Sequence, residues 1–149
     1  MNLYEFEGKQ LFAKHGLNIP RGAVVRRGDD VAAKYVELGI AEVVVKAQVL
    51  SGKRGKNNGI KFCNTVGEVV AACAELFANQ IRGQHVAAVL IEEKLAIAEE
   101  HYVSVIYDTN TRQPVLIYSA QGGMDIEDVA PEKITRVPLD VRSENLPEA

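Results

Sequence analysis

Residues 43 to 56 of the chain read Val43-Val44-Val45-Lys46-Ala47-Gln48-Val49-Leu50-Ser51-Gly52-Lys53-Arg54-Gly55-Lys56. The three β-branched valines favour a buried strand, and Lys46 comes at its end. A buried ammonium needs a partner, because burial without one costs several kcal/mol. The glycine-rich basic loop that follows can offer backbone N–H groups to phosphate oxygens, and the Arg54 guanidinium can bind two such oxygens at once. The segment therefore indicates a buried strand that leads into an anion-binding loop.

The basic loop also has a plainer interpretation, as a solvent-exposed hairpin turn. Spacing alone gives the two interpretations about equal weight, because Gly-Lys-Arg-Gly suits an exposed turn as well as a phosphate site. The loop is not a Walker A motif, since the Gly-x-x-x-x-Gly-Lys-Ser/Thr spacing is absent. The lysine at the end of a buried strand shifts the balance towards phosphate binding.

The composition of the chain is that of an ordinary globular protein. It has 149 residues, of which 47% are hydrophobic and 25% charged. Its net charge of -3 gives it no overall attraction to nucleic acid or to an anionic membrane. No signal peptide follows Met1 and no apolar stretch could span a bilayer, which predicts a soluble, cytoplasmic protein. Cys63 and Cys73 lack zinc spacing and are predicted to be small core residues.

The segments around the loop predict a mixture of helices and strands. Helices are expected over residues 4–15, from Asp29 or Asp30 to Gly39, and after Thr65, where Thr65 and Glu68 form a capping box. Strands are expected over residues 22–25, 43–45, 59–63, 86–92, 102–107 and 115–118. Hairpins mixed with helical crossovers predict an α+β (mixed α/β) fold. The tail from Pro131 is rich in proline and charge. It is expected to hold no helix or strand, as in a chain cut partway through a domain.

Two carboxylates form a second candidate site. Glu92 closes one predicted strand and Glu100 opens the next. A carboxylate at such a hinge can accept hydrogen bonds from ribose hydroxyls, while the hinge backbone can bind an adenine edge. The pattern alone favours the plainer alternative, a charged surface loop between two strands.

Three segments resemble the beta subunit of succinyl-CoA synthetase (succinate–CoA ligase, nucleoside-diphosphate-forming). They lie in the family's order and together span nearly the whole chain, although they cover only the front part of a longer subunit. The middle segment is the most specific. The three segments are Met1-Asn2-Leu3-Tyr4-Glu5-Phe6-Glu7-Gly8-Lys9-Gln10-Leu11-Phe12, Val45 to Lys56, and Gln121-Gly122-Gly123-Met124-Asp125-Ile126-Glu127-Asp128-Val129-Ala130.

The resemblance implies an ATP-grasp fold, incomplete at the C-terminus. Residues 20–96 would form the first lobe with the phosphate loop, and residues 1–19 plus 97–149 part of the second lobe. No catalytic residue is expected in this segment. The implied nucleotide-binding residues are Lys46 at the phosphates, Lys53, Arg54 and Gly55 in the phosphate loop, Glu92 at the adenine hinge, Leu95 near the base, and Glu100 at the ribose.

Two positions depart from the family pattern. Lys53 stands where the family often has glycine, which makes the loop more basic and less flexible. Leu95 replaces a polar residue that many members have near the base, which leaves the choice between adenine and guanine open.

The resemblance also implies a reaction and a partner. The parent enzyme would convert succinate, CoA and ATP or GTP into succinyl-CoA, nucleoside diphosphate and phosphate. The Mg²⁺ ligands would lie beyond Ala149, and an alpha subunit would carry the phosphohistidine and the CoA site. The histidines His15, His85 and His101 match no such role. The chain alone is therefore expected to have no ligase activity.

Other functions stay open at this point. One is a non-catalytic nucleotide-binding or subunit-interaction module. A citrate–CoA or malate–CoA ligase relative would share the architecture, and an unrelated ATP-grasp carboxylase or amide ligase is a further alternative. The acid substrate and the nucleotide are not determined by the residues.

Overall fold

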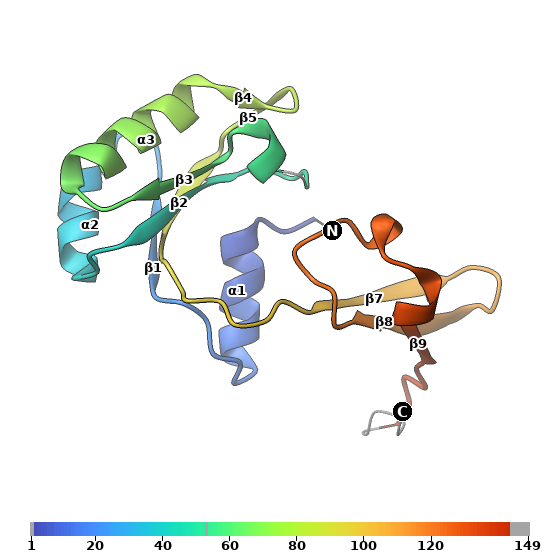
Figure 1. Ribbon diagram of the computed structural model, residues 1–149. Coiled ribbons are helices and arrows are strands. Elements are labelled where there is room, and N and C mark those ends of the chain that lie inside the picture. Colours follow the sequence, from blue (N-terminus) through green and yellow to red (C-terminus); the bar gives the residue numbers. More distant parts are fainter. Residues whose placement is uncertain (1, 53, 144–149) are drawn as a thin grey trace. The chain divides into compact units, whose positions relative to one another are not determined.

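The computed structural model describes residues 2–52 and 54–143, which fall into two compact units, Met1–Leu95 and Ala96–Ala149. The first unit holds a four-stranded antiparallel sheet in the order β1-β6-β2-β3 (Figure 1). Its elements are α1 (Glu5–Lys14), β1 (Gly22–Val25), α2 (Val31–Leu38), β2 (Val43–Gln48), the 3₁₀ helix η1 (Gly55–Asn57), β3 (Ile60–Cys63), α3 (Val66–Ala78), β4 (Gln80–Ile81), β5 (Gln84–His85) and β6 (Ala88–Glu93).

The helices of the first unit cover both faces of this sheet. Figure 1 shows α2 and α3 on one side and α1 on the other. Alternation along β2 explains the arrangement, because successive side chains of a strand point to opposite faces. Val43 and Val45 belong to the core cluster beneath α2 and α3. Lys46 and Gln48 therefore point towards α1.

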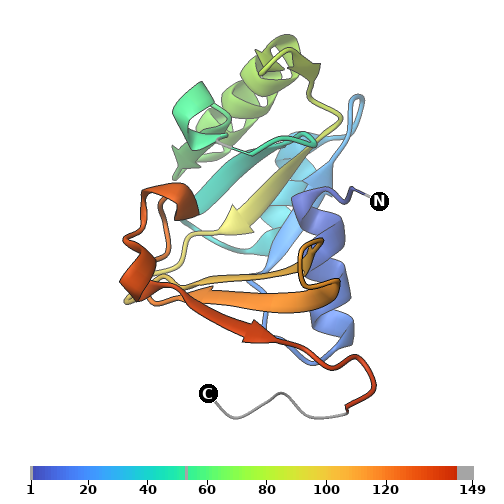
Figure 2. The same cartoon turned by 90° about the vertical axis from the view of Figure 1, so that its right-hand side faces the viewer.

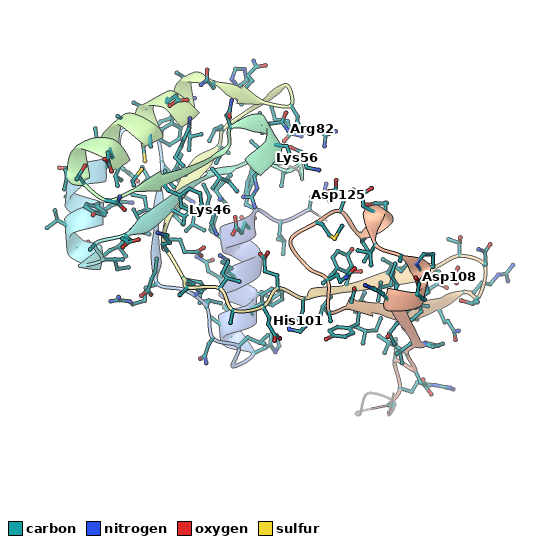
Figure 3. The ribbon with its side chains drawn as sticks, viewed as in Figure 1. Lys46, Lys56, Arg82, His101, Asp108 and Asp125 are labelled. Carbon is teal, nitrogen blue, oxygen red and sulfur yellow. The ribbon has the colours of Figure 1, made fainter. Side chains whose placement is uncertain are left out.

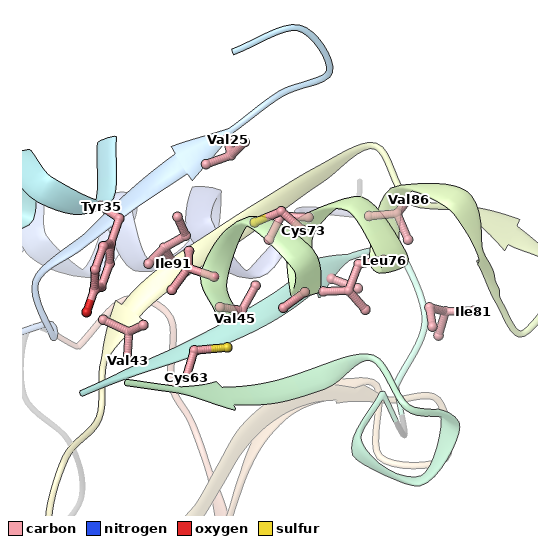
Figure 4. Packing of buried hydrophobic residues seen from close by; sticks show 14 of the residues in the cluster. Val25, Tyr35, Val43, Val45, Cys63, Cys73, Leu76, Ile81, Val86 and Ile91 are labelled. Carbon is pink, nitrogen blue, oxygen red and sulfur yellow. The ribbon is translucent and has the colours of Figure 1, made fainter. Parts of the chain in front are cut away.

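The larger core is apolar and closely packed. Leu76 of α3 and Ile91 of β6 are almost completely buried, and so are several valines of the sheet (Figure 4). Cys63 and Cys73 are free and buried in this core, which confirms their prediction as small core residues. Burial raises the pKa of the Cys73 thiol to about 12. Both cysteines therefore serve packing and are kept as neutral thiols.

Helix α1 contacts the sheet through a smaller cluster. Phe6 is its one buried residue, and it packs against Ala88 and Leu90 of β6. The Phe6 N–H donates a hydrogen bond to the side-chain oxygen of Gln48, which is itself completely buried. Since α1 buries so little apolar surface, polar contacts have a large share in holding it against the sheet.

The second unit is built on a three-stranded antiparallel sheet in the order β7-β8-β9. Figure 2 shows its strands in orange to red. The Asp108 carboxylate accepts hydrogen bonds from the Asn110 N–H and the Thr111 hydroxyl, which fixes the turn between the first two strands. The elements of this unit are β7 (Tyr102–Asp108), β8 (Gln113–Ser119), η2 (Ile126–Asp128), η3 (Pro131–Lys133) and β9 (Thr135–Pro138).

Helix caps were the most accurate sequence predictions. Asp30 accepts a hydrogen bond from the Ala33 N–H at the start of α2, and Gly39 ends that helix in the left-handed conformation. Thr65 accepts from the Glu68 N–H at the start of α3, as predicted. The second hydrogen bond of the predicted capping box differs. The Glu68 carboxylate accepts from the Asn64 N–H and not from the Thr65 N–H.

Two predictions about strands were wrong. The tail was expected to hold no helix or strand, yet β9 pairs with β8 and η3 precedes it. Pro138 is tolerated because β9 lies at the edge of its sheet and proline closes the strand.

Strand β2 also continues two residues past Lys46, because Ala47 and Gln48 keep pairing with β6. Lys46 therefore lies inside the strand and not at its end.

The short hairpin of β4 and β5 was not predicted from sequence. Each strand has two residues, too few to give an alternating pattern. Its turn is formed by Arg82 and Gly83, both at positive φ, as a two-residue hairpin of this kind requires.

In the described part of the chain, no helix is both long and apolar enough to cross a membrane.

The compact units do not test the predicted assignment of residues 1–19 to a second lobe of the complete domain. In the structure, α1 belongs to the unit of residues 1–95. The lobe assignment stays a prediction.

Candidate functional site

Lys46 leaves β2 on the side of α1 (Figure 3), and two carboxylates hold its ammonium. Its ammonium lies 2.5 Å from Glu92 Oε2 and 3.2 Å from Glu5 Oε1. The expectation that this lysine needs a partner is thus confirmed. Burial lowers the pKa of Lys46, but the hydrogen bond to Glu92 and the charge of Glu5 outweigh it, so the net shift is upward. Lys46 therefore stays charged at neutral pH.

Glu5, in the first turn of α1, is shared by three cations. Its Oε1 lies 3.0 Å from the Lys9 ammonium, and its Oε2 lies 2.7 Å from Nη1 of Arg54. Burial raises the pKa of Glu5, but the positive charges of Arg54, Lys46 and Lys9 lower it to about 2. Lys9 also donates a hydrogen bond to Glu92. We refer to Glu5, Lys9, Lys46, Arg54 and Glu92 as the charged cluster.

The chain segments that build the charged cluster lie far apart in sequence. Glu5 and Lys9 come from one face of α1, since residues four apart on a helix are neighbours. Lys46 and Glu92 come from adjacent strands, and in register Glu92 faces Val44, two residues before Lys46. Both side chains therefore leave the sheet on the face that α1 covers. The three cations outnumber the two carboxylates, which leaves the cluster with an excess positive charge.

Arg54 organises the basic loop from within. Its Nη1 donates a hydrogen bond of 3.0 Å to the Ala47 carbonyl, which ties the side chain to β2. Its own carbonyl accepts from the Asn57 and Gly59 N–H groups. A Cβ on Gly59 would lie 3.1 Å from that carbonyl oxygen, so the close turn favours glycine there. Hydrogen bonds of Arg54 therefore hold the loop in a defined turn.

A cavity of about 670 Å³ opens beside this loop. Its wall combines residues of the loop, among them Arg54, with Glu5 of α1. Lys53 lies outside the described residues, so its predicted place in the loop is not described. The cavity is lined by Asn2, Leu3, Glu5, Val49, Leu50, Ser51, Gly52, Arg54, Gly55 and Ile60.

The segment that follows β6 was predicted to bind the adenine. Glu92 is only 3% exposed, and its carboxylate is bound by Lys46 and Lys9. The N–H groups of the next two residues are also occupied, with Glu93 donating to the Arg21 carbonyl and Lys94 to the Glu42 carbonyl. Leu95 is 52% exposed. In this structure Glu92 is the counterion of Lys46, and the exposed part of the segment begins at Lys94.

Glu100, the predicted ribose ligand, lies in the second unit against the Gly122-Gly123 turn. The Gly122 N–H donates a hydrogen bond of 2.8 Å to the Glu100 carbonyl. A Cβ on Gly122 would lie 2.6 Å from the Glu100 carbonyl carbon and 2.7 Å from the His101 nitrogen. Gly123 has a φ of +72°, and a Cβ there would meet the Glu100 carboxylate. These two glycines therefore determine where Glu100 can lie.

The ATP-grasp domain family matches residues 2–149 of the chain. The chain belongs to the ATP-grasp family. The fold class predicted from the sequence is thereby confirmed. Its helices and antiparallel sheets give an α+β version of the ATP-grasp fold.

Curated ATP-grasp relatives confirm the resemblance found in the sequence. The chain is 43% identical over 150 aligned residues to succinate–CoA ligase [ADP-forming] subunit beta of Methanocaldococcus jannaschii, covering 99% of this chain and 40% of the relative. It is 41% identical to the protein of the same name from Desulfurococcus amylolyticus, covering 94% of this chain and 38% of the relative. The chain thus spans about two fifths of the length of these relatives.

Solved structures show the same fold at low sequence identity. Ca. Korarchaeum cryptofilum ACD1 in complex with coenzyme A superposes with a TM-score of 0.71 at 19% identity, covering 91% of this chain and 58% of that one. The D-alanine-D-alanine ligase from Coxiella burnetii gives a TM-score of 0.52 at 16% identity, covering 74% and 31%. These likenesses support the ATP-grasp fold.

Sequence reasoning assigned no site role to Glu5 or Lys9. A Glu–Lys pair at i,i+4 is a visible signal for a helix-surface ion pair. The contact of Glu5 with Lys46, however, joins residues 41 positions apart. Only the packing of α1 on the sheet brings them together.

Among the described residues, no group of three or more His, Cys, Asp and Glu side chains is arranged to hold a metal ion. The expected position of the ligands beyond Ala149 stays a prediction.

The lowered pKa of Glu5 predicts an acid-dependent contribution to stability. Because about 2 lies below the ordinary value of 4.5, the ion pairs of Glu5 stabilise the fold fully above pH 4.5 and are lost as the pH falls towards 2. We expect Glu5→Gln to have a lower urea midpoint than wild type at neutral pH, with the difference shrinking across this window. Circular dichroism measures both midpoints. A difference that does not change with pH would contradict the assignment.

Proposed function

We propose that this chain is the nucleotide-binding part of an acid–CoA ligase. The complete enzyme would convert succinate, CoA and ATP or GTP into succinyl-CoA, nucleoside diphosphate and phosphate. The observation that supports nucleotide binding most is the placement of Arg54 and other loop residues at one cavity, with Lys46 joined to Arg54 through Glu5. The names of the curated relatives support the choice of reaction.

The phosphates are proposed to bind Lys46, Arg54 and the backbone at Gly55, with Lys53 adding charge. Phosphoryl transfer requires little covalent chemistry from the protein and depends on positioning and charge stabilisation. Arg54 is suited to this task because the Ala47 carbonyl holds its guanidinium in place. Lys46 is suited because it stays protonated. A cation that is already positioned stabilises phosphate charge without further reorganisation.

The base is proposed to bind at the segment that follows β6, near Glu92 and Leu95. Since the N–H groups of Glu93 and Lys94 donate within the protein, an adenine edge would have to be bound from Leu95 onward. Leu95 offers an apolar surface and no side-chain hydrogen bond. This arrangement favours recognition of the base by backbone groups.

The ribose is proposed to bind Glu100, whose ionised carboxylate can accept hydrogen bonds from two hydroxyls. The Gly122-Gly123 turn supports this role because it holds the Glu100 backbone at close range. An alpha subunit is the proposed partner and would carry the phosphohistidine and the CoA site. Magnesium would neutralise phosphate charge in the complete enzyme.

Titration calorimetry with the 149-residue chain tests the proposal. We expect ATP or GTP to bind clearly more tightly than adenosine or guanosine, because most of the binding energy comes from the phosphate cations. No ligase turnover is expected when succinate and CoA are added without an alpha subunit. Absence of nucleotide binding would favour the alternative, a subunit-interaction module. Turnover by the isolated chain would contradict the assignment of the metal ligands and the CoA site to other parts of the enzyme.

A further inference from the structure

Glu5 lies between two of the proposed phosphate cations, Arg54, which lines the cavity with it, and Lys46, which lies behind them. Glu5 lines the cavity together with Arg54 and residues of the loop. Its two oxygens reach separate cations, Oε1 the Lys46 ammonium at 3.2 Å and Oε2 the Arg54 guanidinium at 2.7 Å. A phosphate group bound by Lys46 and Arg54 would offer oxygens to the same two donors.

A phosphate and the Glu5 carboxylate cannot both keep these contacts. Each is an anion, and two like charges a few ångströms apart repel strongly in a partly buried site. Arg54, which lines the cavity, already shares its guanidinium between Glu5 and the Ala47 carbonyl. The arriving phosphate must therefore separate Glu5 from Arg54 and Lys46.

We propose that Glu5 is an internal competitor for the nucleotide phosphates, and that nucleotide binds by displacing its carboxylate from Arg54 and Lys46. This inference rests on the proposed function and adds a residue that sets nucleotide affinity. Without nucleotide, Glu5 neutralises two cations that would otherwise repel each other. With nucleotide, the phosphates take over that task.

Displacement of Glu5 is favourable in this structure for a specific reason. Lys9, four residues further along α1, lies 3.0 Å from Glu5 Oε1 and also binds Glu92. Glu5 can therefore leave the two phosphate cations and keep an ion pair within its own helix. The displaced carboxylate is never left buried without a partner, which would be costly.

A purely structural role for Glu5 predicts the opposite sign of effect. If Glu5 served only to orient Lys46 and Arg54, its removal would disorder those cations and weaken nucleotide binding. If Glu5 competes with phosphate, its removal strengthens binding even though it lowers the stability of the ligand-free protein. The direction of the affinity change therefore separates the two roles.

The test is titration of ATP and of adenosine into the 149-residue wild type, Glu5→Gln, Glu5→Asp and Glu37→Gln. Glu5→Gln keeps the shape of the side chain and removes its charge. We expect it to lower the Kd for ATP about tenfold, equivalent to about 1.4 kcal/mol, and to leave adenosine binding unchanged. Glu5→Asp keeps the charge on a side chain one methylene shorter, so its Kd for ATP should lie between the two. Circular dichroism checks the folding of each variant.

Glu37→Gln is the matched control, because it makes the same charge change on α2, which packs on the opposite face of the sheet. It should bind ATP like the wild type, and an equal gain in this variant would overturn the inference. ATP binding by Glu5→Gln that is equal to or weaker than wild type would overturn it while leaving the proposed function intact. Failure of both proteins to bind ATP would overturn both. If Glu5→Gln does not fold, the Kd of Glu5→Asp for ATP provides the same test: a value below that of the wild type supports the inference, and an equal or higher value overturns it.

Discussion

Replacing Lys46 by alanine is expected to weaken ATP binding by the chain at least about 30-fold. Truncating one member of a partly buried, hydrogen-bonded charge pair costs about 2–5 kcal/mol, and about 1.4 kcal/mol is a factor of ten. Lys46 projects from the sheet, and its side chain is only 19% exposed. Calorimetric titration with ATP measures the loss.

The same substitution should destabilise the ligand-free first unit. Without Lys46, the buried Glu92 carboxylate keeps Lys9 as its remaining ion-pair partner among the contacts described above. Removing one partner of a buried pair typically costs about 3–5 kcal/mol, and we expect about 3 kcal/mol here because Lys9 remains. Urea unfolding followed by far-UV circular dichroism is the suitable measurement, since the chain has no tryptophan.

Lys61→Ala is the matched control for Lys46→Ala. Lys61 is on β3 in register with Val45, but it pairs with Glu75, whose side chain is 51% exposed. Exposed ion pairs contribute about 0–1 kcal/mol, so this variant should keep both ATP affinity and stability. Wild-type ATP affinity in Lys46→Ala would remove the main support for the phosphate site. An equal loss in Lys61→Ala would show that only the total charge matters.

The parts of the fold that were predicted correctly depend on local chemistry. Asp30, Gly39 and Thr65 determine helix ends through bonds to residues within a few positions, so their effect is visible in sequence. The valine run of β2 was visible for the same reason. The end of this strand could not be predicted in the same way, because Ala47 and Gln48 continue the strand only through pairing with β6.

The charged cluster shows the limit of the same reasoning. The need of Lys46 for a partner followed from burial, but the identity of that partner depends on which strand and which helix lie beside β2. Glu92 was noticed and assigned to the base, whereas its carboxylate binds Lys46 in the structure. In the sequence, Glu5 is an acidic residue in the first turn of a helix. Its contacts with Lys46 and Arg54 form because α1 packs on the sheet. Contacts over such sequence separations are set by topology.

Gly122→Ala is expected to destabilise the second unit by about 2 kcal/mol, since overpacking typically costs about 1–3 kcal/mol. The added Cβ would lie 2.6 Å from the Glu100 carbonyl carbon and 2.7 Å from the His101 nitrogen. These are backbone atoms, so relief requires movement of the chain at Glu100. Hydrogen exchange of the β7 and β8 amides, together with urea unfolding, should show the loss.

The same variant should also weaken ATP binding if Glu100 holds the ribose, because the shift moves the proposed ligand itself. Adenosine affinity should then fall by a similar factor, which separates this effect from a loss at the phosphates. Gly67→Ala is the matched control: Gly67 lies in α3, a Cβ there meets no atom within 4 Å, and alanine favours the helix by about 0.5–1 kcal/mol. Gly122→Ala with wild-type stability and exchange would show that the turn does not constrain Glu100. Lower stability of Gly122→Ala with unchanged adenosine affinity would show that the turn does not affect nucleotide binding. It would contradict the assignment of Glu100 to the ribose.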